Sequence, residues 1–164
     1  MEFLKIAPSP DDAASDAEIE ALLDSVYVSG GFTAPELAPT LLNARAVRQR
    51  GEVLLARGRD EDALLGMVIV VPSDSPGRRM AGPDEAELHL LAVAPEQRGV
   101  GVGRSLVERA LDVARCAGCR RMLLWTQPTM VEAQRLYERV GFRRLPERDF
   151  KNSGRSFLVY EFKL

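Results

Sequence analysis

The segment from Arg98 to Ser105 combines glycines and arginines in a pattern that could bind a phosphate group. Its glycines lack Cβ atoms and let the backbone approach a bulky anion; they are Gly99, Gly101 and Gly103. A helix is predicted to begin here, and the first N–H groups of a helix lack intrahelical partners and attract negative charge. Arg98 and Arg104 add positive charge at the two ends of the loop. The segment predicts a diphosphate site, although an ordinary strand-to-helix turn would also explain the glycines.

The spacing of these glycines excludes two common nucleotide-binding loops. A P-loop requires Gly-Lys-Ser or Gly-Lys-Thr, and neither follows here. A dinucleotide fingerprint, G-x-G-x-x-G, would require glycine at Arg104 or at Leu106. The absence of both loops therefore argues against a nucleotide-binding regulatory domain.

Two motifs, in this order along the chain, resemble a known family. The first is Arg98-x-x-Gly101-x-Gly103, preceded by Leu-Ala-Val and a proline. The second is A-x-x-L-Y-x-x-x-G-F, from Ala133 to Phe142. Over about residues 86–142 they resemble the GNAT superfamily (Gcn5-related) of N-acetyltransferases. The resemblance implies acetyl-CoA as cosubstrate, bound by Leu91, Ala92, Val93, Arg98, Gly99, Val100, Gly101, Val102, Gly103, Arg104 and Ser105.

The same resemblance implies a catalytic acid and an oxyanion site. Tyr137 would protonate the departing CoA thiolate, although its place on an apolar helix face, with Leu136 and Val140, also suits a core residue. Backbone N–H groups of the strand that precedes the loop would polarise the thioester carbonyl. An acceptor amine is mostly protonated at neutral pH, so a base is needed as well.

Glu87 is the base that we predict, and His89 is its rival. Strand alternation places Glu85, Glu87 and His89 on one face, and Glu87 lies six residues before Val93, where several GNAT enzymes carry a water-linked glutamate. His89 is the only histidine and has a suitable intrinsic pKa, but a lone histidine in a strand is more often structural.

Two further features bear on the ligands. Many family members have asparagine, which binds the pantetheine arm, where this chain has Met130; Gln127 or Thr126 could replace it. The acidic group Asp84, Glu85 and Glu87 suggests a cationic acceptor.

Composition limits the class of protein. Lys and Arg total 22 against 24 for Asp and Glu, so no general field attracts nucleic acid or an anionic membrane. No stretch approaches the roughly 18 apolar residues of a membrane span, and no leader is evident, which predicts a cytoplasmic protein. Cys116 and Cys119 lack the partners of a structural zinc site, and we predict no metal.

The elements predict one α/β domain over residues 1–164. We expect strands at 3–7, 52–57, 63–71, 86–93, 121–126, 142–145 and 156–163, and helices at 16–27, 35–48, 106–117 and 130–140. The resemblance implies a mixed, mostly antiparallel sheet of about six to seven strands flanked by about four helices, with a splayed parallel pair at the acetyl-CoA site.

The predicted activity is transfer of an acetyl group to a primary amine by direct attack in a ternary complex. The acceptor would be a small molecule or a peptide, and the protein a monomer or homodimer. The alternative is a non-catalytic acyl-CoA-binding sensor, which would need the loop but neither Tyr137 nor Glu87.

Overall fold

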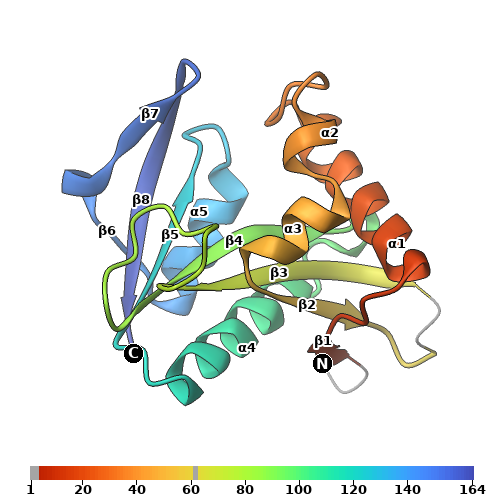
Figure 1. Ribbon diagram of the computed structural model, residues 1–164, viewed down its shortest axis with the longest axis horizontal. Coiled ribbons are helices and arrows are strands. Elements are labelled where there is room, and N and C mark those ends of the chain that lie inside the picture. Colours follow the sequence, from red (N-terminus) through yellow and green to blue (C-terminus); the bar gives the residue numbers. More distant parts are fainter. Residues whose placement is uncertain (1–3, 61–62) are drawn as a thin grey trace.

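The computed structural model describes residues 4–60 and 63–164. In this part of the chain an eight-stranded sheet has the order β1-β2-β3-β4-β5-β8-β6, with β7 paired to β8 (Figure 1). Only β4 and β5 are parallel; the other pairs are antiparallel. The strands are β1 (Lys5–Pro8), β2 (Glu52–Arg57), β3 (Leu64–Pro72), β4 (Glu85–Val93), β5 (Arg121–Thr126), β6 (Arg143–Arg144), β7 (Phe150–Asn152) and β8 (Arg155–Lys163).

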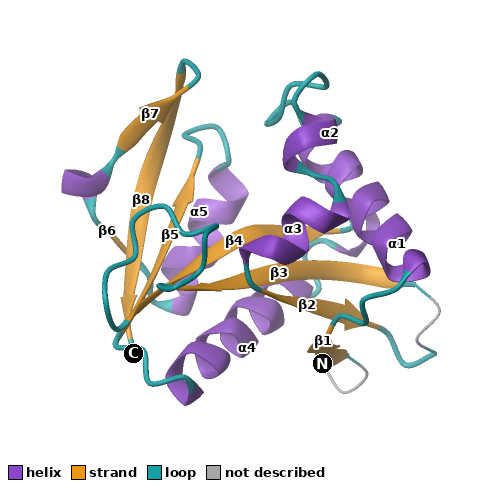
Figure 2. Cartoon of the chain, viewed as in Figure 1, coloured by secondary structure: helices purple, strands orange, loops and turns teal. Residues whose placement is uncertain are grey.

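Helices cover both faces of the sheet (Figure 2). The helices are α1 (Ala13–Leu23), α2 (Ala38–Leu41), α3 (Ala44–Arg50), α4 (Val102–Cys116) and α5 (Val131–Val140), with a π-helical turn η1 (Asp24–Val28) and two 3₁₀ turns, η2 (Pro95–Gln97) and η3 (Pro146–Arg148). The side chain of Asp12 caps α1 by accepting from the Ser15 N–H at 2.7 Å. In the described part of the chain no helix is long and apolar enough to cross a membrane.

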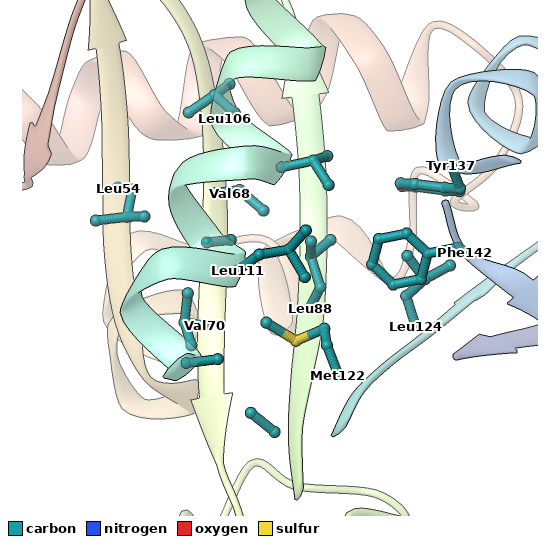
Figure 3. Packing of buried hydrophobic residues seen from close by; sticks show 14 of the residues in the cluster. Leu54, Val68, Val70, Leu88, Leu106, Leu111, Met122, Leu124, Tyr137 and Phe142 are labelled. Carbon is teal, nitrogen blue, oxygen red and sulfur yellow. The ribbon is translucent and has the colours of Figure 1, made fainter. Parts of the chain in front are cut away.

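The core has one large cluster on each side of the sheet. On one side α4 and α5 pack on the strands, and Figure 3 shows Leu106 and Leu111 of α4 beside Val68, with Tyr137 and Phe142 at the edge. Gly66 of β3 lets α4 approach, because a Cβ there would lie 2.9 Å from Leu106 Cδ1 and from the Ala92 carbonyl oxygen. On the other side α1 and α3 cover β2 and β3.

The predicted fold class is confirmed, with two local differences. The helix expected at 35–48 is divided into α2 and α3, because Asn43 is extended and its side chain bonds both ends: it donates to the Pro39 carbonyl at 2.8 Å and accepts from the Ala46 N–H at 2.9 Å. The short strand β7 was not expected, and it forms a hairpin with β8. Phe3, in the first predicted strand, and the turn residues 61–62 lie outside the described residues.

Candidate active site

A β-bulge shapes β4 where the site begins. Met67 is paired with Ala92 and Ile69 with His89, so two residues, Leu90 and Leu91, oppose Val68. Leu90 has φ of 50°, in the left-handed region. After the bulge Ala92 packs on the α1 side of the sheet, while Leu91 and Val93 pack on the α4 side.

From Leu88 onward, a part of the strand that includes the bulge, β4 has no parallel neighbour. The pairing of β4 with β5 is confined to Glu85–Glu87 against Arg121–Leu123. The rest of the two strands diverges, which is the splayed pair that the sequence predicts, and α5 lies behind the opening (Figure 1). A cleft of about 1600 Å³ is lined by both strands and by Tyr137. The open edge of β4 therefore faces a ligand-sized space.

The glycine-rich loop forms one end of this cleft. Gly99 and Gly101 have φ of 80° and 95°, which a side chain would strain, and Gly101 is the N-cap of α4. Gly103 packs closely, since a Cβ there would lie 3.1 Å from Leu136 Cδ2. Most predicted cofactor residues line the cleft: Leu91, Val93, Arg98, Gly99, Gly101, Val102, Gly103 and Arg104. Ala92, Val100 and Ser105 are not among the residues that line it.

Tyr137 lies where a catalytic acid would be needed. Its ring packs edge-on against Phe142, with centroids 5.8 Å apart, and its side chain lines the cleft. Across residues 4–60 and 63–164 no group forms a hydrogen bond with its hydroxyl. Since every fully buried polar side-chain atom in this part of the chain has a partner, the Tyr137 hydroxyl is not fully buried and is open to the cleft. Burial, and then the nearby Tyr27, raise the pKa of the phenol far above its ordinary value. The hydroxyl is a neutral donor that is free for a ligand.

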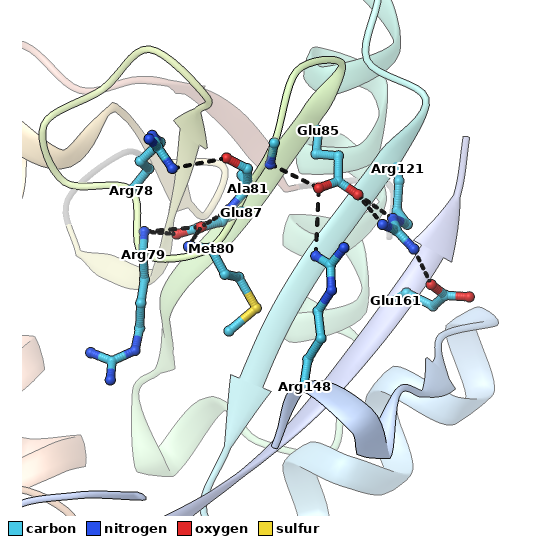
Figure 4. Close-up of polar contacts among 10 residues, drawn as sticks. Arg78, Arg79, Met80, Ala81, Glu85, Glu87, Arg121, Arg148 and Glu161 are labelled. Carbon is cyan, nitrogen blue, oxygen red and sulfur yellow. Dashed lines mark hydrogen bonds and ion pairs between the residues drawn. The ribbon is translucent and has the colours of Figure 1, made fainter. Parts of the chain in front are cut away.

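Glu87 is fully buried and holds a loop. Its carboxylate accepts from the backbone N–H groups of Arg79 (2.9 and 3.0 Å), Met80 (2.6 Å) and Ala81 (2.7 Å), as Figure 4 shows. His89 Nε2 lies 2.8 Å from the remaining oxygen. Burial alone would raise the pKa of this carboxyl, but these hydrogen bonds outweigh it and hold the pKa below its ordinary value. Glu87 does not line the cleft.

His89 connects Glu87 to the cleft. Its Nε2 side faces Glu87, its Nδ1 lies 3.5 Å from Arg50 Nη1, and its ring lies edge-on to Trp125 at a centroid distance of 4.9 Å. His89 lines the cleft. Burial, with the charge of Arg50, lowers the pKa of the imidazole despite the carboxylate beside it. In a neutral ring that donates from Nε2 to Glu87, the Nδ1 lone pair faces Arg50, which also lines the cleft.

The acidic group of the sequence is turned away from the cleft. Glu85 is ion-paired with Arg121, lies 3.5 Å from Arg148, and accepts from the Gly82 N–H at 2.8 Å (Figure 4). Burial tends to raise the pKa of Glu85, but the Gly82 and Arg121 bonds lower it overall. Neither Asp84, Glu85 nor Glu87 lines the cleft. The group supplies no negative surface for a cationic acceptor.

The residues considered for the pantetheine arm have other partners. Met130 lines the cleft, and its sulfur lies 3.1 Å from Thr126 Oγ1. Gln127 donates to the Phe32 carbonyl at 2.9 Å. The side chains of Thr126 and Gln127 therefore stabilise nearby structure.

Several cleft residues were not identified from the sequence. Tyr27, in η1, donates from its hydroxyl to the Leu91 carbonyl at 2.9 Å and so reaches the open part of β4. Five arginines that were not assigned to the site also line the cleft; they are Arg50, Arg79, Arg155 and, on α5, Arg135 and Arg139. The available signal in the sequence is the loop Ser29–Phe32, whose two glycines beside an aromatic residue fit either a ligand border or an ordinary turn, and Phe32 does line the cleft.

Comparison with known proteins agrees with this geometry. The model of the acetyltransferase (GNAT) family matches residues 17–142. A mycothiol acetyltransferase of Beutenbergia cavernae is 35% identical over 127 residues, which are 69% of this chain and 43% of that protein, so the chain spans less than half of that relative's length.

Solved structures share the fold over the whole chain. A GCN5-related N-acetyltransferase from Kribbella flavida has a TM-score of 0.75 at 24% identity and covers 99% of each chain. A Bacillus subtilis acetyltransferase in complex with CoA has a TM-score of 0.70 at 20% identity, covering 98% of this chain and 99% of that one. Acetyl-CoA is the acyl donor of the matched family, as the sequence predicts. With the family match extending from α1 to the end of α5, this chain belongs to the acetyltransferase (GNAT) family.

Proposed function

We propose that residues 1–164 form a single N-acetyltransferase domain that transfers an acetyl group from acetyl-CoA to a primary amine by direct attack in a ternary complex. One observation carries the proposal: the hydroxyl of Tyr137, without a protein partner, shares a cleft with the open part of β4 and the loop at the start of α4. The anion site, the acid and the thioester platform therefore face one space.

The loop is suited to the pyrophosphate of acetyl-CoA. Gly99 and Gly101 bring the backbone close to an anion, and the N-terminal N–H groups of α4 favour negative charge. Arg98 and Arg104 line the same end of the cleft. The thioester would then lie along Leu91–Val93, where backbone N–H groups can stabilise the oxyanion of the tetrahedral intermediate.

We assign proton removal to His89 and a positioning role to Glu87, in place of the direct role that the sequence suggested for Glu87. His89 faces the cleft, whereas the Glu87 oxygens are occupied by three N–H groups and by His89 itself. Glu87 would fix the tautomer in which Nε2 carries the proton and Nδ1 accepts one.

These groups account for each proton that moves in the reaction. The amine nitrogen attacks the thioester carbonyl carbon and gives its proton to His89 Nδ1. The C–S bond breaks, and Tyr137 donates its hydroxyl proton to the leaving thiolate. The products are the N-acetyl amine and CoA, and the proton on His89 restores Tyr137 through water.

The test compares two tyrosines of the same core. Tyr137→Phe should lower kcat about 100-fold, a typical contribution of a general acid. The matched control is Tyr160→Phe, because Tyr160 is equally buried but bonds Glu138 and does not line the cleft. Acetyl-CoA binding by calorimetry should be unchanged in both variants, and amine-dependent thiol release should fall only in the first.

Three results would count against the proposal. Absence of acetyl-CoA binding would mean that the glycine loop is only a turn. Binding without thiol release on any amine would favour the acyl-CoA sensor. Full activity of Tyr137→Phe would remove Tyr137 as the acid. A cytoplasmic location, a monomeric or homodimeric state, and no dependence on nucleic acid, membrane or metal belong to the same proposal and are tested by fractionation, light scattering and chelation.

A further inference from the structure

The acceptor end of the cleft, opposite the glycine loop, carries a distinctive set of charges. Its walls are α2 on one side and the β7–β8 hairpin on the other, which stand on opposite sides of the sheet opening (Figure 1). Three guanidinium groups reach it from separate elements: Arg50 ends α3, Arg79 lies in the loop before β4, and Arg155 begins β8. None of the three has a carboxylate partner in the part of the chain that the structure describes.

Arg50 is the most enclosed of the three. Its Nη2 donates to the Leu41 carbonyl at 3.1 Å, and its Nη1 lies 3.5 Å from His89 Nδ1. Its contacts among the described residues are with an imidazole and a carbonyl and not with a carboxylate, and burial lowers the pKa of this guanidinium. A buried charge is costly unless it is paired, so an anionic ligand would relieve this cost.

Arg155 and Arg79 retain free hydrogen-bonding capacity. Arg155 uses Nη1 for the Gly31 and Phe32 carbonyls, at 3.1 and 2.7 Å, and for Gln127 Oε1 at 3.0 Å. Arg79 lies with Cζ 4.0 Å above the Phe150 ring, and its side chain extends away from Glu87 (Figure 4). Neither charge is neutralised by these contacts.

The cleft contains little negative charge. Among the described residues that line it, Glu132 is the single carboxylate, and it lies in the first turn of α5. The acceptor end thus favours an anionic group, in contrast to the cationic acceptor that the acidic sequence group suggested.

An aromatic wall continues from His89. Trp125 lies edge-on to Phe150 with centroids 5.7 Å apart, and Phe150 stacks on Phe157 at 5.0 Å. All three line the cleft, together with Phe32 from the facing loop. This surface is suited to an apolar or aromatic side chain.

We propose that the acceptor is an α-amino acid with a large apolar or aromatic side chain, whose carboxylate is bound by Arg50 with support from Arg155 and Arg79. The inference rests on the proposed acetyltransferase function. An amine that gives its proton to His89 Nδ1 lies about 3 Å from that atom, and a carboxylate on Arg50 Nη1 is equally close to its donor. The two protein atoms are 3.5 Å apart, so one small acceptor can reach both when a single carbon separates its amine from its carboxylate. That spacing favours an α-amino acid, whereas the amino terminus of a peptide would offer Arg50 a neutral amide carbonyl in place of the carboxylate.

The experiment compares each amino acid with its own amide. Thiol release from acetyl-CoA is measured with L-phenylalanine, L-leucine and L-methionine and with their carboxamides, and kcat/KM is expressed per free amine. We expect at least one acid to exceed its amide by about 30-fold or more. Arg50→Gln should lower the ratio of kcat/KM for that acid to kcat/KM for its amide about 30-fold, because only the acid loses a charge-assisted hydrogen bond.

The control is Arg45→Gln, which removes the same charge from the exposed face of the same helix. It should leave kcat/KM unchanged for both the acid and its amide. Acetyl-CoA affinity reports whether Arg50→Gln is folded, and Arg155→Gln provides a second variant with the same expected direction. If every amide equals its acid, or if Arg50→Gln slows both alike, the inference is overturned while the acetyltransferase stands. If no amine of any kind releases thiol, the proposed function fails and the inference fails with it.

Discussion

The substitution Glu87→Gln directly tests whether the hydrogen bonds of this buried carboxylate stabilise the loop before β4 and His89. In the native protein one oxygen accepts from the Met80 and Ala81 N–H groups, and the other accepts from Arg79 and faces His89 Nε2. Glu87→Gln keeps one acceptor oxygen. The amide NH₂ must then face either two backbone donors or the Arg79 N–H and His89.

The expected loss of stability follows from the hydrogen bonds that the glutamine side chain cannot make. With the amide oxygen placed toward Met80 and Ala81, the contact with Arg79 becomes donor against donor, and His89 must change its tautomer to accept. Hydrogen bonds to charged groups contribute about 1.5–3 kcal/mol, so we expect the free energy of unfolding to fall by about 3 kcal/mol at pH 7. For a chain of this length that corresponds to a decrease in Tm of about 6–12 °C.

The measurement is urea unfolding followed by the fluorescence of Trp125, the only tryptophan. The contribution of Glu87 is complete above the ordinary carboxyl pKa of 4.5 and is lost as the pH falls through the lower pKa of the folded state. The difference between wild type and variant should therefore be constant near neutral pH and shrink in acid. Glu52→Gln, an exposed carboxylate on β2, is the control and should change stability by less than about 0.5 kcal/mol. A loss below about 1 kcal/mol for Glu87→Gln, or one independent of pH, would refute the argument.

Three further predictions concern the loop, the packing of α4 and the base. Gly101→Val places a β-branched side chain at φ of 95°, and calorimetry should show acetyl-CoA binding at least about 10-fold weaker; native affinity would mean that the loop backbone does not contact the cofactor. Gly66→Val, whose Cβ would meet Ala92 O and Leu106 Cδ1 at 2.9 Å, should lower stability by about 1–3 kcal/mol in urea, and an unchanged midpoint would contradict this close packing. Burial lowers the His89 pKa below its ordinary value of 6.5, so kcat/KM calculated per free amine should fall only at pH values below 6.5. His89→Gln should abolish this decrease in acid. A decrease that persists in the variant would assign the base elsewhere.

The fold was largely predictable because its signals are local. The strands 52–57 and 121–126 were expected with the bounds that are observed, since each is a short β-rich run between turn residues. The helix after the glycine loop was evident from apolar residues at helical spacing. The division of 35–48 was missed because it depends on one Asn43 side chain that bonds two helix ends at once, which periodicity does not report.

The proposed cofactor end of the cleft could be recognised in the sequence for a related reason. Its residues are contiguous, and the glycines of the loop have a physical purpose that spacing reveals. The acceptor side is made by side chains far apart in the sequence: Arg50 contacts His89, and Arg155 contacts Phe32. Each of these residues alone resembles an ordinary surface charge or core aromatic. Only the folded chain brings them to one cleft.

The proposed role of Glu87 would link stability to acceptor choice in this protein. Its carboxylate accepts from the backbone of Arg79, Met80 and Ala81 and so fixes the loop before β4, while Met80 packs beside the smaller core cluster of β5 and β8. The same bonds place the Arg79 guanidinium over Phe150, at the acceptor end of the cleft. On its other side Glu87 orients His89, which lies against Arg50. In the proposed mechanism, a buried carboxylate that does not line the cleft would therefore position both the base and the Arg79 guanidinium. Its loss should impair selection for a carboxylate in the acceptor before it impairs acetyl-CoA binding, because the glycine loop is built from α4 and β4 residues that Glu87 does not contact.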